Sequence, residues 1–368
     1  MKRTVSLVST LLALTLAVAG CAGVASTDAN GSAGGSTSPV QTAEPRPETQ
    51  DTILITHQLG ETPVPVNPEK VVVFDFGILD TLDLLGVKVA AVPKSNLPPY
   101  LSKYDNDEVI NAGTLFEPDF EALSALDPDL IIISGRTETQ YEALNELAPT
   151  IYMAVDTNNY MASFKQNMEY IGAIFQKEDV VAAEVKRIED LAAEVRGKVA
   201  SSGEKALILL SNDKAISAYG PGSRFGIIHD VLGFPAADES IQVSTHGDQV
   251  SFEYVKEKNP DYIFVIDRAA VVSGGGQPAK DTFNNDLVKA TNAYKNGKII
   301  YLDPNYWYLS GGGLVSVSAM IDEVAAALAE EMREAAVNSD PCAGAAIQTT
   351  RCGPGSANAP TSAGETVR

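Results

Sequence analysis

The sequence predicts an α/β protein with two Rossmann-like lobes, whose parallel-rich sheets are joined by a long helix and whose ligand cleft lies between the lobes. Three observations predict this class. Residues 119–136 (DFEALSALDPDLIIISGR) and 251–268 (SFEYVKEKNPDYIFVIDR) form an internal repeat, 132 positions apart. Short apolar runs alternate with helical stretches in both halves, as in βαβ units. Between the halves, residues 163–199 carry few helix breakers and have apolar residues at helical spacing.

Each copy of the repeat predicts a short helix, a stop and a buried strand. The Pro-Asp pair ends the helix because proline restricts the residue before it. The apolar run that follows is typical of a strand covered on both faces. Each copy finishes on an arginine, Arg136 or Arg268. Because ligands bind at the carboxyl ends of strands in open parallel sheets, we expect both arginines to face one cleft and to form an anion site.

The remaining elements follow from the same patterns. In the first lobe, which begins near Thr52, we expect strands at 70–74, 87–92, 130–134 and 150–154, and helices at 79–85 and 120–126. The linking helices have an expected break near Gly172 or at 177–179. In the second lobe we expect strands at 206–210, 216–219, 262–266 and 299–302, and helices at 227–232 and 315–336. The predicted organisation is a signal (1–20), a tether (21–51), a first lobe (52–160), linking helices (161–203), a second lobe (204–336) and a tail (337–368).

The N-terminus resembles a bacterial lipoprotein signal. Lys2 and Arg3 precede an apolar stretch, and small residues lead to Cys21. We therefore expect a diacylglycerol on the Cys21 thiol and an anchor on the outer face of the cytoplasmic membrane. An ordinary secretory signal with an incidental cysteine is the alternative. No other segment has the roughly 18 apolar residues that a membrane span requires.

The two flanking segments have compositions that predict disorder. Residues 22–50 and 338–368 are rich in Gly, Ser, Ala, Thr and Pro, and bury too little apolar surface to fold. The tail contains Cys342 and Cys352, which form either a local disulfide or two free thiols.

The charge balance limits the class of partner. The net charge is −21, and it becomes −23 without Lys2 and Arg3. No basic face is available to replace counterions along a nucleic acid, so nucleic acid is excluded as a partner. A small anion can still bind where a few arginines gather in a cleft.

Loops that follow the predicted strands supply five candidate ligand-binding side chains. These are Arg136, Arg224, His246, Arg268 and Tyr308. Surface arginines paired with carboxylates, a loop histidine without a ligand and an aromatic packing cluster are the alternatives that composition offers.

Several long motifs around these residues carry a resemblance. VVVFDFGILDTLDLLG, GPGSRFGIIHDVLGF, STHG, NPDYIFVIDR and KIIYLDPNYWYLSGGG occur in order between about residues 71 and 324. The chain resembles the substrate-binding lipoproteins of bacterial ferric-siderophore ABC transporters, especially those that take catecholates. The resemblance implies a monomeric receptor that captures a ferric siderophore for import, with no turnover and no cofactor of its own.

The resemblance also implies roles for single residues. Arg136, Arg224 and Arg268 would form a triad that neutralises the anionic complex, since guanidinium groups make planar, charge-assisted hydrogen bonds. His246 and Tyr308 would complete the coordination of Fe(III) in a tetradentate complex, because Fe(III) is a hard cation that favours oxygen donors. Tyr306 competes with Tyr308 for the phenolate role.

Two glutamates recur at one position of the repeat. Glu121 and Glu253 lie near the start of a helix, where the dipole favours a carboxylate. The resemblance implies that one such glutamate on each lobe docks the protein on its permease, with Glu117 as the alternative in the first lobe.

Other functions fit the sequence less well. The same architecture could bind haem, a corrinoid or a free metal ion, although three histidines are few for a protein-built zinc or manganese site. An extracytoplasmic hydrolase would need a nucleophile elbow or a metal cluster, and the sequence shows neither. A surface adhesin or structural lipoprotein would bind no coloured ligand.

Overall fold

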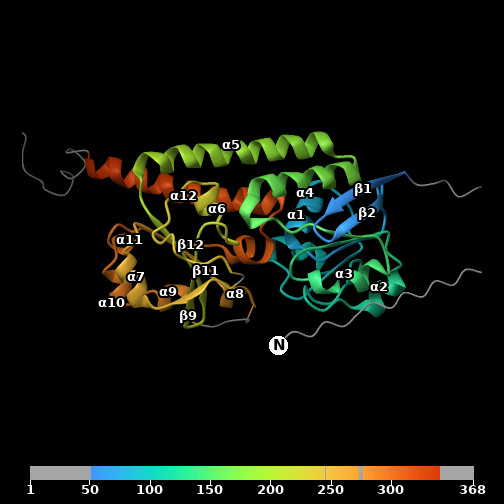
Figure 1. Cartoon of the computed structure of the whole chain (residues 1–368), viewed down its shortest axis with the longest axis horizontal. Coiled ribbons are helices and arrows are strands. Elements are labelled where there is room, and N and C mark those ends of the chain that lie inside the picture. The colour runs from blue at the N-terminus through green and yellow to red at the C-terminus, as the bar shows by residue number, and fades with distance from the viewer. Residues whose placement is uncertain (1–50, 245, 273–276, 340–368) are drawn as a thin grey trace, which may run out of the picture. The chain divides into compact units, whose positions relative to one another are not determined.

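The computed structural model describes residues 51–244, 246–272 and 277–339, and it contains two five-stranded sheets (Figure 1). The signal, Cys21, most of the tether, and Cys342 and Cys352 lie outside the described residues. Within the described part of the chain, no helix combines the length and apolar character needed to cross a membrane.

The first sheet is parallel throughout, and its strands lie in the order β5-β4-β3-β6-β7. The chain runs outward from β3 on one side and from β6 on the other, so the β3–β6 pair is the topological switch point. An antiparallel hairpin, β1–β2, precedes the sheet. The bounds of these elements are β1 (Thr52–His57), β2 (Gly60–Pro65), β3 (Val71–Val73), α1 (Phe76–Leu84), β4 (Ala91–Val92), η1 (Pro99–Tyr104), β5 (Ile110–Asn111), α2 (Phe120–Leu126), β6 (Leu130–Ile133), η2 (Glu138–Gln140), α3 (Tyr141–Asn145), β7 (Thr150–Tyr152) and η3 (Thr157–Asn159).

The second sheet has the order β10-β9-β8-β11-β12, and β9 runs antiparallel to both of its neighbours. Its switch point is the parallel pair β8–β11. The bounds are β8 (Ala206–Asn212), β9 (Ala215–Tyr219), α6 (Ile227–Asp230), β10 (Asp248–Val250), α7 (Phe252–Lys258), β11 (Tyr262–Asp267), α8 (Arg268–Val272), α9 (Ala279–Thr282), α10 (Asp286–Lys289), α11 (Asn292–Lys295), β12 (Ile299–Leu302) and η4 (Asn305–Ser310).

Two long helices occupy the region where the sequence predicts the link between the halves. They are α4 (Tyr160–Phe175) and α5 (Glu178–Ser202), and α5 packs against both α4 and α12 (Leu314–Ser339) (Figure 1). The break falls at Gln176, which has a left-handed φ of 53°, and at Lys177. The expected break at 177–179 overlaps the observed one only at Lys177, because Glu178 and Asp179 already belong to α5, and Gly172 lies inside α4.

The two copies of the repeat fold alike, as predicted. Each short helix ends on a left-handed residue, Asp127 or Asn259, and a buried strand follows. The aspartate of each Pro-Asp pair accepts hydrogen bonds from the backbone that enters the neighbouring strand: Asp129 binds the segment before β3, and Asp261 the segment before β8. The repeated motif therefore fixes the switch point of both sheets.

Other expected elements are wrong in extent. The strand expected at 87–92 shrinks to β4, because the chain leaves α1 through Gly86 and the Val87 N–H still bonds to the Leu82 carbonyl. The hairpin β1–β2, the edge strands β5 and β10 and most of the short helices have no counterpart among the expected elements.

Candidate functional site

A wide turn after β12 presents the candidate tyrosine. Residues Asn305–Ser310, here called the tyrosine turn, form a single π-type turn closed by a hydrogen bond of 2.8 Å from the Gly311 N–H to the Tyr306 carbonyl. Such turns are frequent at functional sites. Trp307 and Leu309 are each 3% exposed and belong to the core, whereas Tyr308 between them is half-buried and packs against the margin of that core. The Trp307 indole N–H also donates to Glu323 of α12 at 2.7 Å.

Three arginines that follow three separate strands converge on Tyr308. Arg136 follows β6, Arg224 follows β9, and Arg268 follows β11. Their guanidinium carbons lie 5.5, 4.6 and 5.6 Å from the centroid of the Tyr308 ring. Arg268 Nε donates to the phenol oxygen at 2.8 Å. Arg136 and Arg224 donate to the Tyr308 carbonyl, and Arg136 also reaches the Leu309 carbonyl at 3.3 Å.

The cluster concentrates positive charge. Among the described residues, none of the three arginines forms a salt bridge. Arg268 instead donates to the Asn212 amide oxygen at 2.9 Å. Burial, and then the charge of Arg224, lower the pKa of Arg136, and the buried Asp75 nearby only partly opposes this shift. This arrangement differs from surface arginines paired with carboxylates, and it can accept an anion of multiple charge.

The phenol of Tyr308 is tuned toward its ionised form. Burial alone would raise its pKa, but the hydrogen bond from Arg268 and the charges of the three guanidinium groups outweigh burial, so the pKa lies below its ordinary value. A phenolate is a hard oxygen donor of the kind that Fe(III) prefers.

Tyr306 lies in a different environment. Its ring packs against Tyr100, with centroids 4.8 Å apart, and the arginine contacts fall on Tyr308. Burial and nearby carboxylates raise its pKa. The geometry therefore favours Tyr308 over Tyr306 as the phenolate.

His246 is exposed in the turn before β10 and makes no hydrogen bond within the part of the chain that the structure describes. The next residue, Gly247, has a φ of 68° and packs so closely on Tyr219 that a Cβ there would lie 2.7 Å from the ring. The loop therefore rests on Tyr219, and among the described residues His246 makes no hydrogen bond, ring contact or cation-π contact with Tyr308 or with an arginine. Its role as a ligand stays a prediction.

Both repeated glutamates are exposed in the first turn of a helix. Glu121 follows the cap Asp119 of α2, and Glu253 follows the cap Ser251 of α7. Glu117 is exposed as well. All three are accessible to a partner.

Sequence reasoning missed several residues that support the site. Asp75 follows β3, accepts from the Ser134 hydroxyl at 2.6 Å and caps α1. Asn212 ends β8 and holds Arg268. Both lie at a switch point, so the rule that selected the arginines could have found these two polar residues at the ends of apolar runs. Tyr100 is 210 positions from its partner Ser310, and no local pattern indicates it.

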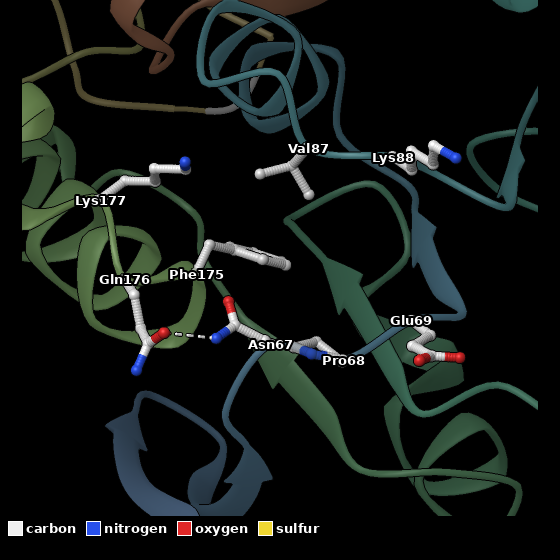
Figure 2. Close-up of a pocket in the computed structure, with 8 residues that line it drawn as sticks. All are labelled: Asn67, Pro68, Glu69, Val87, Lys88, Phe175, Gln176 and Lys177. Atoms are coloured by element: carbon white, nitrogen blue, oxygen red, sulfur yellow. Dashed lines mark hydrogen bonds between the residues drawn. The ribbon is translucent and has the colours of Figure 1, made fainter.

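A separate pocket of about 650 Å³ lies at the amino ends of the strands of the first sheet, opposite the carboxyl ends that carry Arg136 (Figure 2). Asn67 and Glu69 precede β3, and Val87 precedes β4, whereas Arg136 follows β6. Phe175 and Val87 face each other across it, and Asn67 donates to Gln176 at 2.7 Å (Figure 2). This pocket is not the arginine site. Nor do the described residues contain a cluster of three or more His, Cys, Asp or Glu side chains able to hold a metal ion.

Comparison with known proteins identifies the family. Residues 71–306 match the model of the periplasmic binding protein family. The chain belongs to this family. It is a family of substrate-binding proteins rather than enzymes, and the resemblance noted in the sequence is confirmed.

Relatives of this periplasmic binding protein are siderophore-binding proteins. It is 51% identical over 279 residues to the petrobactin-binding protein YclQ of Bacillus subtilis strain 168, a match covering 75% of this chain and 88% of YclQ. It is 34% identical over 277 residues to the ferric-anguibactin-binding protein FatB of Vibrio anguillarum, covering 74% of this chain and 86% of FatB.

Solved structures agree with this assignment. The crystal structure of YclQ matches with a TM-score of 0.74 and 50% identity, over 76% of this chain and 99% of that one. The catecholate-siderophore binding protein VctP of Vibrio cholerae matches with a TM-score of 0.73 and 37% identity, over 75% and 100%. The predicted two-lobe α/β class is thereby confirmed.

Proposed function

We propose that this protein is an extracytoplasmic receptor that captures a ferric catecholate siderophore and delivers it to an ABC importer. The convergence of Arg136, Arg224 and Arg268 on Tyr308, with no carboxylate paired to any of them among the described residues, carries the proposal. The similarity to YclQ, FatB and VctP, which are named for binding petrobactin, ferric anguibactin and catecholate siderophores, supports it. The protein binds and releases its ligand without turnover, as a monomer anchored through Cys21 to the outer face of the cytoplasmic membrane.

The chemistry of the ligand fits the cluster. A ferric catecholate keeps net negative charge, which suits planar guanidinium donors better than ammonium groups. Each guanidinium has five N–H donors, and Arg136 and Arg268 each use only two of them in the hydrogen bonds described above. The remaining donors are available to catecholate oxygens.

Tyr308 and His246 are the proposed iron ligands. A tetradentate siderophore leaves two positions open on a six-coordinate ion, which a phenolate and an imidazole can fill. The lowered pKa of Tyr308 supports the phenolate role. The exposed His246 has no competing hydrogen bond among the described residues. Glu121 and Glu253 are the proposed docking points for the permease.

The experiment compares a tetradentate bis-catecholate with a hexadentate tris-catecholate, both as Fe(III) complexes. Tyr308→Phe and His246→Ala should each weaken the tetradentate complex at least about tenfold more than the hexadentate one, because only the former needs protein ligands. Tyr294→Phe, at an exposed tyrosine of α11, is the matched control and should change neither affinity. Equal losses for both complexes would remove the coordination role, and no binding of either by the unaltered protein would reject the function.

A further inference from the structure

The tyrosine turn belongs to the second half of the chain but is held in place from the first. Tyr100, in η1, contacts the turn at two points. Its hydroxyl lies 2.6 Å from the Ser310 hydroxyl, and its ring packs on Tyr306 at 4.8 Å. These two residues stand two positions before and two positions after Tyr308.

Tyr100 is itself anchored by the buried side chain of Asp80. The Tyr100 hydroxyl donates to the Asp80 carboxylate at 3.2 Å, so the phenol oxygen accepts from the Ser310 hydroxyl. Asp80 is 1% exposed and also accepts the backbone N–H groups of Val315 and Ser316, at the start of α12. Asp80 is therefore held between α1 and α12. Through the Tyr100 hydroxyl, it also holds Ser310 of the tyrosine turn.

We propose that Tyr100 is a positioning residue for Tyr308, which sets the place of the iron-binding phenol and so favours siderophores that leave coordination sites open. The inference rests on the proposed function of Tyr308. Tyr100 touches neither the arginines nor Tyr308 in the described contacts, so it acts through the backbone of the turn. Preorganising a ligating group increases affinity because less conformational freedom is lost on binding.

The consequence is selective. A tetradentate ferric complex needs the Tyr308 oxygen at one place, and it loses affinity when the turn can adopt other conformations. A hexadentate complex is held by the arginines, without a protein ligand on the iron, and is insensitive to the place of that oxygen. A purely structural role for Tyr100 would instead affect both complexes alike, or only the stability of the fold.

The test is Tyr100→Phe, which keeps the ring on Tyr306 and removes only the hydroxyl. Tyr104→Phe is the matched control, since Tyr104 lies in the same η1 and donates to Asp83 at 2.9 Å. Tyr100→Phe loses the hydrogen bonds to Asp80 and to Ser310, of which only the second reaches the turn. It should weaken binding of the Fe(III) bis-catecholate about five- to tenfold, the effect of losing that one hydrogen bond to the turn. The phenolate-to-iron charge-transfer band should shift. The tris-catecholate affinity should stay within about twofold, and Tyr104→Phe should change neither.

Ser310→Ala removes the same hydrogen bond from the other side and is a second, independent variant. It should reproduce the selective loss, and the double variant should lose no more than Tyr100→Phe alone. An unchanged bis-catecholate affinity in both variants, or equal losses for both complexes, overturns the inference. If Tyr308→Phe leaves bis-catecholate binding intact, the coordination role itself fails and the positioning role falls with it. If only Tyr308→Phe has an effect, the coordination role stands and the positioning role fails.

Discussion

Arg268→Gln is the perturbation whose effect the structure defines best. The guanidinium donates to the Tyr308 phenol at 2.8 Å and contributes one of the three charges around it. A hydrogen bond to a charged group contributes about 1.5–3 kcal/mol. At about 1.4 kcal/mol for each factor of ten, the affinity for a ferric bis-catecholate should fall by about ten- to 150-fold. Loss of this hydrogen bond also raises the pKa of Tyr308, so part of the deficit should disappear as the pH is raised.

The assay is quenching of the single tryptophan, Trp307, which lies in the tyrosine turn beside Tyr308. Arg187→Gln is the control, because it removes the same charge from the exposed face of α5, where Arg187 pairs with Glu184. Dissociation constants for Arg268→Gln and Arg187→Gln that agree within about twofold would refute the reasoning, since net charge alone would then explain any effect.

Three further predictions concern stability and docking. Burial raises the pKa of Asp80 to about 7, so its contribution to stability is fully present below the unfolded pKa near 4 and is lost as the pH rises through about 7. The free energy of unfolding of Asp80→Asn, measured in urea, should therefore rise relative to that of the unaltered protein by up to about 4 kcal/mol between pH 4 and 8. If the two free energies of unfolding change in parallel with pH, the prediction is wrong. Gly313→Ala should destabilise the fold by about 1–3 kcal/mol in thermal or urea unfolding, because its Cβ would overlap a backbone carbonyl of α1. Gly197→Ala, in open space on α5, should instead be neutral or stabilising by up to about 1 kcal/mol, and equal effects would contradict the packing argument. Glu121→Arg with Glu253→Arg should abolish ferric-siderophore uptake by cells while leaving ligand affinity within about twofold, and undiminished uptake would remove these glutamates from docking.

The parts of the fold that local patterns determine could be predicted from the sequence. The repeat predicted two helix–strand units, and strand ends located Arg136 and Arg268 at the switch points. These predictions succeed because a Pro-Asp stop and a buried apolar run act within a few residues. The antiparallel β9 and the hairpin β1–β2 could not be obtained in this way, since pairing direction depends on distant partners.

The sequence predicted which residue types form the site, but not the contacts that hold Tyr308 in place. Composition offers Tyr306 and Tyr308 equally, and only the wide turn separates them, by directing Tyr308 toward the arginines. The Asp80–Tyr100–Ser310 chain joins residues up to 230 positions apart, with no motif in common. Such contacts depend on how the two halves meet, which local sequence does not encode.

The most direct test of siderophore capture is a titration of the purified protein with the Fe(III) complex of a bis-catecholate, followed by Trp307 fluorescence and visible absorbance. Saturable quenching, together with a charge-transfer band that shifts in Tyr308→Phe, is the predicted result. Absence of saturable quenching by both the bis-catecholate and a tris-catecholate complex, in a protein that instead binds haem or a corrinoid under the same conditions, would contradict it.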